Sequence, residues 1–147
     1  MEDDSYNNSN PNIGLPVFCS GRINRYFQTA KNVACDSVYG KIRHGAVLVK
    51  GGSVINTACN KDHFNSFADR FRPHDCGPAT KHAEVHCILG LTKQQTAGAD
   101  MFVCRINRRG EFRMSKPCMM CHIALKNAGI KRVFYTTNYG GIEMYKL

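Results

Sequence analysis

Two short motifs in this chain hold residue types that bind metal ions and move protons. They are His82-Ala83-Glu84 and Pro117-Cys118-Met119-Met120-Cys121. A histidine and two cysteines offer three ligands to zinc, which prefers four, so one position is left for a water molecule. A closed structural site would fill all four positions with protein ligands. His82, Cys118 and Cys121 therefore predict a zinc ion that holds a reactive water, as in metal-dependent hydrolases.

The carboxylate in the first motif has a different expected task. Glu84 follows His82 by two residues, so on a helix it projects from another side and should not bind the metal. We expect it to take a proton from the water and to deliver protons to the substrate. Two cysteines at this spacing would, on their own, favour a redox pair or core residues over a metal site. The presence of both motifs favours the zinc site.

Both motifs fall at the start of a predicted helix. Thr80 can cap a helix over about residues 81–93, which places the first motif in its first turn. Proline suits the first position of a second helix, over residues 117–128. Cys118 and Cys121 are three residues apart and so lie on one face of that helix. We therefore expect two helix N-termini to face one metal ion.

The rest of the chain predicts a sheet between helices. Residues 21–37 carry apolar residues at three- and four-residue steps, the pattern of an amphipathic helix. Apolar runs at 46–49 and 54–57 are joined by a Gly-Gly turn and predict a β-hairpin. Short apolar runs at 101–104 and 133–136 predict two more strands. The order α-β-β-α-β-α-β predicts an α/β fold, a three-layer α/β/α sandwich with a mixed sheet of four or five strands.

Length and composition indicate one folded domain. The chain has 147 residues, of which 43% are hydrophobic and 21% charged, as in ordinary globular proteins. No apolar run reaches membrane-spanning length, so no membrane partner is expected. Residues 1–16 are polar and are expected to form a disordered tail ahead of a single domain over residues 17–147. The residues after 139 form either an irregular tail or an edge strand.

Charge and cysteine content bear on partners and compartment. The net charge is +9, and residues 1–12 hold three acidic groups and no basic ones, so the rest carries +12. Such a balance favours an anionic partner, either a nucleotide or a nucleic acid strand, although a basic surface can also serve solubility. The acidic N-terminus lacks the layout of a signal peptide. We therefore expect a cytoplasmic protein whose eight cysteines are reduced or bind metal.

From about residue 43 to residue 138 the chain resembles the cytidine/deoxycytidylate deaminase superfamily. Besides the two motifs, segments 45–49, 58–60 and 128–135 carry this resemblance, which is nearer to the deoxycytidylate branch than to the short nucleoside branch. It implies a cytidine-deaminase-like fold, one catalytic zinc and a homo-oligomer. It also implies hydrolytic deamination of a cytosine nucleotide, from dCMP or CMP to dUMP or UMP plus ammonia.

The resemblance also implies roles for single residues. A hydroxide on the zinc would replace the 4-amino group, while Glu84 moves protons to the ring nitrogen and the leaving amine. Asn60 falls where family members hold the substrate sugar, although a residue that ends a strand can equally be a turn residue. The backbone N–H of Ala83 would face the cytosine carbonyl. His86 and Cys87 stand where deoxycytidylate deaminases commonly have asparagine and alanine.

A basic connector leads into the second motif. Its cations are Arg105, Arg108, Arg109, Arg113 and Lys116. Because the end of the connector must lie beside the metal, we expect Arg113 and Lys116 to bind a substrate phosphate through hydrogen bonds. The alternative is a solvated basic loop.

The long segment 60–81 has no clear period and interleaves rings with cations. These residues are Lys61, His63, Phe64, Phe67, Arg70, Phe71 and Arg72. Such rings could stack the bases of a single strand, or they could hold the loop against the core. A second, structural zinc is also considered. Its ligands would be His63, His74 and Cys76 with Cys35 or Cys59, at irregular spacing.

Three alternatives to a cytosine mononucleotide stay open. The enzyme could act on a base within single-stranded DNA, RNA or tRNA, or on a free nucleoside. The chain could also be a zinc-stabilised binding module without activity. The carboxylate of Glu84 argues against this last alternative, because a scaffold has no use for it.

Overall fold

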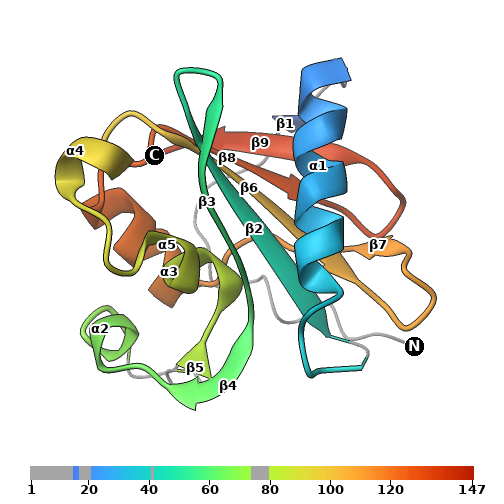
Figure 1. The fold of residues 1–147 in the computed structure, drawn as a ribbon, viewed down its shortest axis with the longest axis horizontal. Helices are drawn as coiled ribbons and strands as arrows, with labels where there is room; N and C mark the ends of the chain where they lie inside the picture. Colours follow the sequence, from blue (N-terminus) through green and yellow to red (C-terminus); the bar gives the residue numbers. More distant parts are fainter. Residues whose placement is uncertain (1–14, 17–20, 41, 74–79) are drawn as a thin grey trace.

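Three central strands carry nearly continuous apolar runs because helices cover both faces of the sheet. They are β2 (Arg43–Lys50), β6 (Asp100–Ile106) and β8 (Arg132–Thr136). β6 pairs antiparallel with β2 and parallel with β8, so the sheet is mixed. The computed structural model describes residues 15–16, 21–40, 42–73 and 80–147, and Figure 1 shows their fold.

Four further strands extend this centre. β3 (Ser53–Cys59) pairs with β2, and together they are the predicted hairpin, which turns at two glycines with positive φ. β9 (Ile142–Lys146) pairs with β8, so the residues after 139 do add a strand, which the sequence left open. β1 (Leu15–Pro16) pairs with β9, and β7 (Phe112–Arg113) pairs with the end of β6.

The predicted three-layer α/β/α sandwich with a mixed sheet is confirmed. Within the described residues the main sheet has seven strands, where four or five were expected. The difference lies in β1 and β7, because a strand of two residues is too short for a period to be visible in the sequence.

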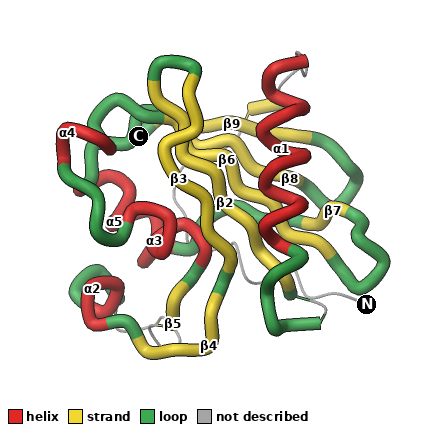
Figure 2. The backbone as a smooth tube through the Cα atoms, in the orientation of Figure 1, coloured by secondary structure: helices red, strands yellow, loops and turns green. Residues whose placement is uncertain are grey.

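The helices form the two outer layers (Figure 2). α1 (Gly21–Ala34) packs on one face of the sheet. α3 (Ala83–Ile88) and α5 (Met119–Asn127) pack on the other face. Two short helices, α2 (Ser66–Asp69) and α4 (Lys93–Thr96), lie on the same side as α3 and α5. Among the described residues, the helices fall short of the length and apolar character needed to cross a membrane.

The helix predicted over residues 81–93 starts later than expected. Thr80 does not cap it, because Thr80 and Lys81 form β5 (Thr80–Lys81), which pairs with β4 (Lys61–Phe64). The chain therefore stays extended up to His82, which is the N-cap of α3 with ψ 150°. The pairing partner lies about twenty residues away in the sequence, so a local helix signal could not reveal it.

The same predicted helix also ends earlier than expected. Its last residue is Ile88, and Gly90 then turns the chain with φ 82°, a conformation that suits glycine. A second helix, α4, begins at a capping box made by Thr92 and Gln95. The predicted span thus holds one short helix, α3, and ends at the first residue of a second one, α4.

Only the end of the predicted disordered tail can be placed. Residues 1–14 lie outside the described residues. Leu15 and Pro16 form β1, opposite Met144 and Glu143 of β9.

Each face of the sheet carries its own apolar core. Under α1, the rings of Phe102 and Phe134 stack at 4.6 Å, and Phe27 of α1 packs edge-on against Phe102. On the other face, buried residues such as Leu48 and Val103 pack against α3 and α5. Burial on both faces fixes where α3 and α5 begin relative to the ends of the central strands.

A glycine-to-alanine substitution in β2 is expected to destabilise the fold strongly. A Cβ atom at Gly45 would lie 2.0 Å from the carbonyl oxygen of Ala30 in α1, so the helix would have to move. For Gly45→Ala we expect the free energy of unfolding, measured by urea denaturation, to fall by about 1–3 kcal/mol or more. Gly21→Ala is the control, since a Cβ there meets nothing within 4 Å. Equal stability of the two variants would contradict the close contact.

Candidate active site

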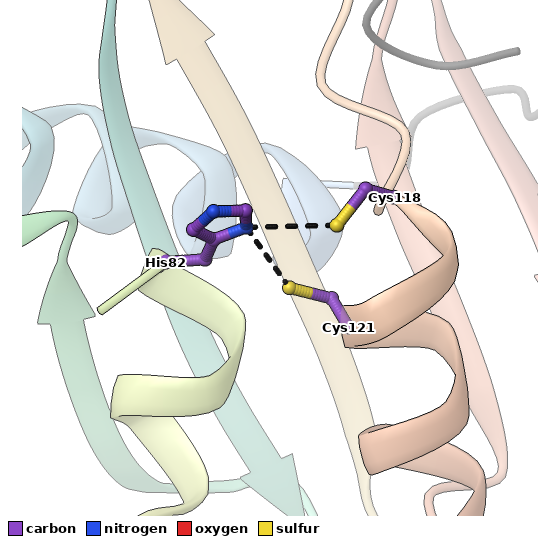
Figure 3. Close-up of side chains that lie close together, drawn as sticks. All are labelled: His82, Cys118 and Cys121. Atoms are coloured by element: carbon purple, nitrogen blue, oxygen red, sulfur yellow. Dashed lines mark hydrogen bonds between the residues drawn. The ribbon is translucent and has the colours of Figure 1, made fainter. Parts of the chain in front are cut away.

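The N-termini of α3 and α5 bring the predicted metal ligands together (Figure 3). The Nδ1 atom of His82 lies 3.6 Å from the sulfur of Cys118 and 3.4 Å from that of Cys121. All three ligand atoms lie within 4.8 Å of one another. In the described part of the chain, these three residues are the group of histidines, cysteines and carboxylates that could hold a metal ion.

The local backbone explains this convergence. His82 and Cys118 are both N-cap residues with extended backbone angles, so each one directly precedes the first turn of its helix. Cys121 lies one helical turn after Cys118 and points to the same side. The N-terminal ends of the helix dipoles face the cluster, which favours thiolates there.

The geometry of the three donors fits zinc. Ligand atoms at about 2.0–2.3 Å from one tetrahedral ion are separated from each other by about 3.5 Å, close to the observed separations. Cys121 is fully buried and Cys118 is 9% exposed, so both residues are shielded from solvent. One imidazole and two thiols are the donor types that zinc prefers, and they leave one position for water.

The three candidate ligands differ in how readily they lose a proton. The hydrogen bond with Cys121 and the proximity of His82 lower the pKa of Cys118 to about 4. Burial, together with the hydrogen bond to Cys118, raises the pKa of Cys121. Burial lowers the pKa of His82, but the hydrogen bond and charge of Cys118 outweigh it and raise that pKa. One thiolate is thus present beside the other two ligands.

Glu84 lies next to the same cluster and is 4% exposed. Burial raises the pKa of its carboxyl group to about 7, while its side chain hydrogen-bonds the Cys121 thiol. A carboxyl with this pKa can both accept and donate a proton near neutral pH. Ala83, just before it, is the first residue of α3, so its N–H is not needed by the helix.

Asn60 holds the end of β3 against β2. Its Oδ1 accepts a hydrogen bond from His44 N at 3.0 Å, and its Nδ2 donates to Ile42 O at 2.9 Å. Each polar atom keeps one further position for a ligand. Asn60 thus joins β3 to the start of β2 rather than forming a turn, and the sugar contact stays a prediction.

The two predicted phosphate ligands lie in different surroundings. Arg113, in β7, forms an ion pair with Glu111 at 3.6 Å and donates to Phe112 O at 3.1 Å. The ammonium of Lys116 lies over the rings of Tyr135 and Tyr145, at 6.0 and 5.6 Å, and burial lowers its pKa. Lys116 is two residues from Cys118, so it is the nearer of the two to the metal ligands along the chain.

Two buried polar residues lie side by side in the sheet. His44 had no role assigned from the sequence, and Arg105 was expected in the basic connector but belongs to β6. His44 and Arg105 are paired across β2 and β6 and are 3% and 4% exposed. Strand alternation places them on the face that carries α3 and α5, below the cluster. The alternation of residues along the strand could have indicated that His44 is buried, since it shares its strand face with Ala46 and Leu48.

The buried histidine gives a testable pH dependence. Burial, then the charges of His82 and Arg105, lowers the pKa of His44 to about 3. Between about 6.5 and 3 only the unfolded chain takes up this proton, so the stability that His44 contributes is lost as the pH falls through this window. By NMR, we expect the ring signals of His44 to stay constant from about pH 8 to pH 5. Titration of those signals near pH 6.5 would contradict its burial.

The phenylalanines of the long segment hold it against the core. Phe67 and Phe71 pack on the α3–α5 face, and the guanidinium of Arg70 lies 5.0 and 5.6 Å from their ring centres. Of the second-zinc candidates, His74 and Cys76 lie outside the described residues. That second site therefore stays a prediction.

The comparisons with known proteins establish the family. Residues 21–137 match the cytidine and deoxycytidylate deaminase zinc-binding region. The chain therefore belongs to the cytidine and deoxycytidylate deaminase family, and it is a zinc-dependent deaminase. No curated protein matches its sequence.

Solved structures agree with the fold. The dCMP deaminase of cyanophage S-TIM5 in its apo form has a TM-score of 0.56 at 24% identity, covering 79% of this chain and 82% of the phage chain. The same enzyme in complex with dCMP and dUMP has a TM-score of 0.52 at 22% identity, covering 83% and 86%. At these identities the likeness supports the cytidine-deaminase-like architecture.

Proposed function

We propose that this enzyme converts dCMP or CMP into dUMP or UMP and releases ammonia. The observation that carries this proposal is the buried carboxyl of Glu84 beside the converging ligands His82, Cys118 and Cys121. A metal-binding cluster alone could be structural. A buried proton carrier next to it supports hydrolysis.

The chemistry divides between the metal and the chain. When bound, zinc lowers the pKa of a coordinated water, so that a nucleophile is available near neutral pH. Glu84 takes one proton from this water and delivers it to N3 of the cytosine. It then takes the second proton from the hydroxyl added at C4 and delivers it to the departing amine. Oxygen is thereby added at C4, the C4–N4 bond breaks and ammonia leaves. No net proton remains on Glu84, which returns to its starting state.

Residues around Glu84 would orient the base and the sugar. The Ala83 N–H would donate to the cytosine carbonyl, and the remaining positions on the Asn60 amide would contact the sugar. Both positions lie at the ends of elements that pack on the sheet, which keeps them rigid. Lys116 and Arg113 would bind the 5′-phosphate.

A substrate panel tests this proposal. We expect dCMP or CMP to be deaminated with a higher kcat/KM than deoxycytidine, cytidine or a cytosine within an oligonucleotide, with ammonia release as the readout. Equal turnover of the free nucleosides would contradict the nucleotide preference. Zinc-loaded protein that releases ammonia from none of these compounds would contradict the activity itself. Size-exclusion chromatography with light scattering would test the homo-oligomer, which we propose on the resemblance alone.

Substitution of Lys116 tests whether this residue binds the substrate phosphate without taking part in the chemical step. For Lys116→Gln we expect the KM for dCMP to rise about tenfold or more with little change in kcat, because a contact made equally in ground and transition states is lost. Deoxycytidine, which has no phosphate, is the matched control and should be unaffected. An equal rise in KM for both compounds would assign Lys116 a role unrelated to phosphate.

A further inference from the structure

The β6–β7 hairpin gathers cations from three segments at one end of the molecule. We call this group the basic hairpin patch. It consists of Lys31 of α1, Arg43 of β2, Arg113 of β7, and Arg108 and Arg109 in the turn between β6 and β7. The carboxylate of Glu111 lies among these five cations and pairs with Arg113.

Contacts between the segments hold the patch together. Nη2 of Arg43 donates to Asn107 O at 2.7 Å, which ties the hairpin to β2. The ammonium of Lys31 lies 5.7 Å from the ring centre of Phe112, which ties it to α1. The side chain of Arg108 lies over Gly40, where a Cβ would be 3.3 Å from Nε. The cations are thus placed by the fold and are not spread along a free loop.

The turn of the hairpin is also ordered. Oδ1 of Asn107 accepts hydrogen bonds from Arg109 N and Glu111 N, each at 3.0 Å. Gly110 has φ 79° and completes the turn. Arg108 and Arg109 are exposed on this turn, so two guanidinium groups face solvent from a fixed backbone. Such preorganised cations bind an anionic partner without a large ordering cost.

The patch adjoins the active site through the chain that leaves the hairpin. Ser115 is 1% exposed, and its hydroxyl donates to Val103 O at 2.9 Å, which anchors the segment that runs on to Cys118. Met114 N donates to Oδ1 of Asn138 at 2.8 Å. The β8–β9 loop is therefore attached to the exit of the hairpin, and Figure 1 shows the two loops at the same end of the sheet.

That second loop presents an aromatic ring. Tyr139 is 98% exposed, and the turn that carries it is closed by the hydrogen bond from Thr137 N to Gly141 O at 2.9 Å. A fully exposed tyrosine on an ordered turn gains nothing from the core, but it offers a flat surface on which a base can stack.

We propose that the basic hairpin patch binds the phosphate backbone of a single-stranded nucleic acid, with Tyr139 stacking on one of its bases. Four of the five cations are arginines, whose planar forks match phosphate oxygens in pairs. An extended strand offers a row of phosphates and unstacked bases together, the combination that the cations and the ring fit. This inference goes beyond the mononucleotide reaction proposed above, because binding at the patch requires no turnover.

The test uses the full zinc-loaded protein and a fluorescein-labelled oligothymidylate of about 15 nucleotides, which lacks an amino group to react. Fluorescence anisotropy gives the affinity at several salt concentrations. We expect Arg108→Gln combined with Arg109→Gln to weaken binding about tenfold and to lower the salt slope by about 1.4, since each lost phosphate contact removes about 0.7. Tyr139→Ala should weaken binding at least about fivefold without changing the salt slope.

The matched control removes the same charge elsewhere. Lys126→Gln combined with Lys146→Gln takes two exposed cations from α5 and β9, neither of which contributes to the basic hairpin patch. We expect this pair to change the affinity less than twofold. Zinc content and the unfolding temperature report whether each variant is folded.

Several outcomes would overturn the proposal. Equal weakening by the two double variants would show that only the overall charge matters. Absence of binding at low salt would remove the site altogether. A polyglutamate peptide that binds as tightly as the oligonucleotide would assign the patch to acidic proteins. The anisotropy experiment measures binding without deamination. Absence of oligonucleotide binding would therefore not contradict the proposed mononucleotide activity, and absence of that activity would not contradict binding at the patch.

Discussion

Replacing Glu84 by glutamine is expected to remove nearly all deaminase activity and to leave the zinc content unchanged. Glutamine keeps the shape of the side chain, but it cannot take up and release a proton near neutral pH. General acid–base catalysis contributes about 10²–10⁴-fold to rates, so kcat/KM for the nucleotide should fall at least about 100-fold. Ammonia release measures the activity, and elemental analysis measures zinc.

The stability of Glu84→Gln distinguishes a catalytic from a structural role. Burial raises the pKa of Glu84 to about 7, whereas the unfolded chain ionises this group near its ordinary value of 4.5. The folded state therefore loses stability as the pH rises from 4.5 through 7, because the unfolded chain releases the proton first. Glutamine removes this cost, so the variant should unfold at an equal or higher temperature than the wild type at pH 8.

Other combinations of results would point elsewhere. If Glu84→Gln kept its activity, the assigned proton path would be wrong. If it lost zinc together with activity, Glu84 would act by supporting the ligands. Only inactivity with full zinc content and undiminished stability fits the proposed proton carrier.

The metal ligands were predictable because their signal is local. Cys118 and Cys121 lie one turn apart on a single helix, and proline marks where that helix begins. His82 comes from another helix, but its neighbour Glu84 makes the motif specific. Two short motifs thus defined the chemistry, and the fold had only to bring two helix ends together.

The features that escaped prediction depend on pairing between distant segments. β5 exists because β4 pairs with it, so the chain reaches His82 extended and Thr80 cannot act as a cap. β7 has two residues and exists only against β6. His44 became noticeable only when β2 placed it beside Arg105 and below the cluster. The spacing of apolar residues along the sequence does not show which distant strands pair with each other.

Asn60 illustrates a limit of a family resemblance. The resemblance placed it at the end of a strand and near the substrate. In the structure the same amide bonds to the backbone at His44 and Ile42, so it also fixes the edge of β2. A substitution at Asn60 would disturb the sheet, so a resulting loss of activity would not isolate a contact with the sugar.

Loss of one cysteine ligand is expected to abolish the stabilisation of the fold by zinc. Cys121 is 0% exposed and lies between Cys118, His82 and Glu84, so Cys121→Ser leaves two protein ligands at the buried end of the site. A ligand that binds only the folded state stabilises it by about 4 kcal/mol when it is present at 1,000 times its Kd. For a chain of this size that corresponds to about 8–16 °C in the unfolding temperature.

A second buried cysteine provides the matched control. Cys104 is also 0% exposed, but it lies on the opposite face of the sheet, in the core under α1. Cys104→Ser places the same hydroxyl in a buried position and should lower the unfolding temperature directly. The decisive quantity is the rise in unfolding temperature when zinc is added to chelator-treated protein. Wild type and Cys104→Ser should both show this rise and Cys121→Ser should not; an equal rise in all three would place the zinc elsewhere.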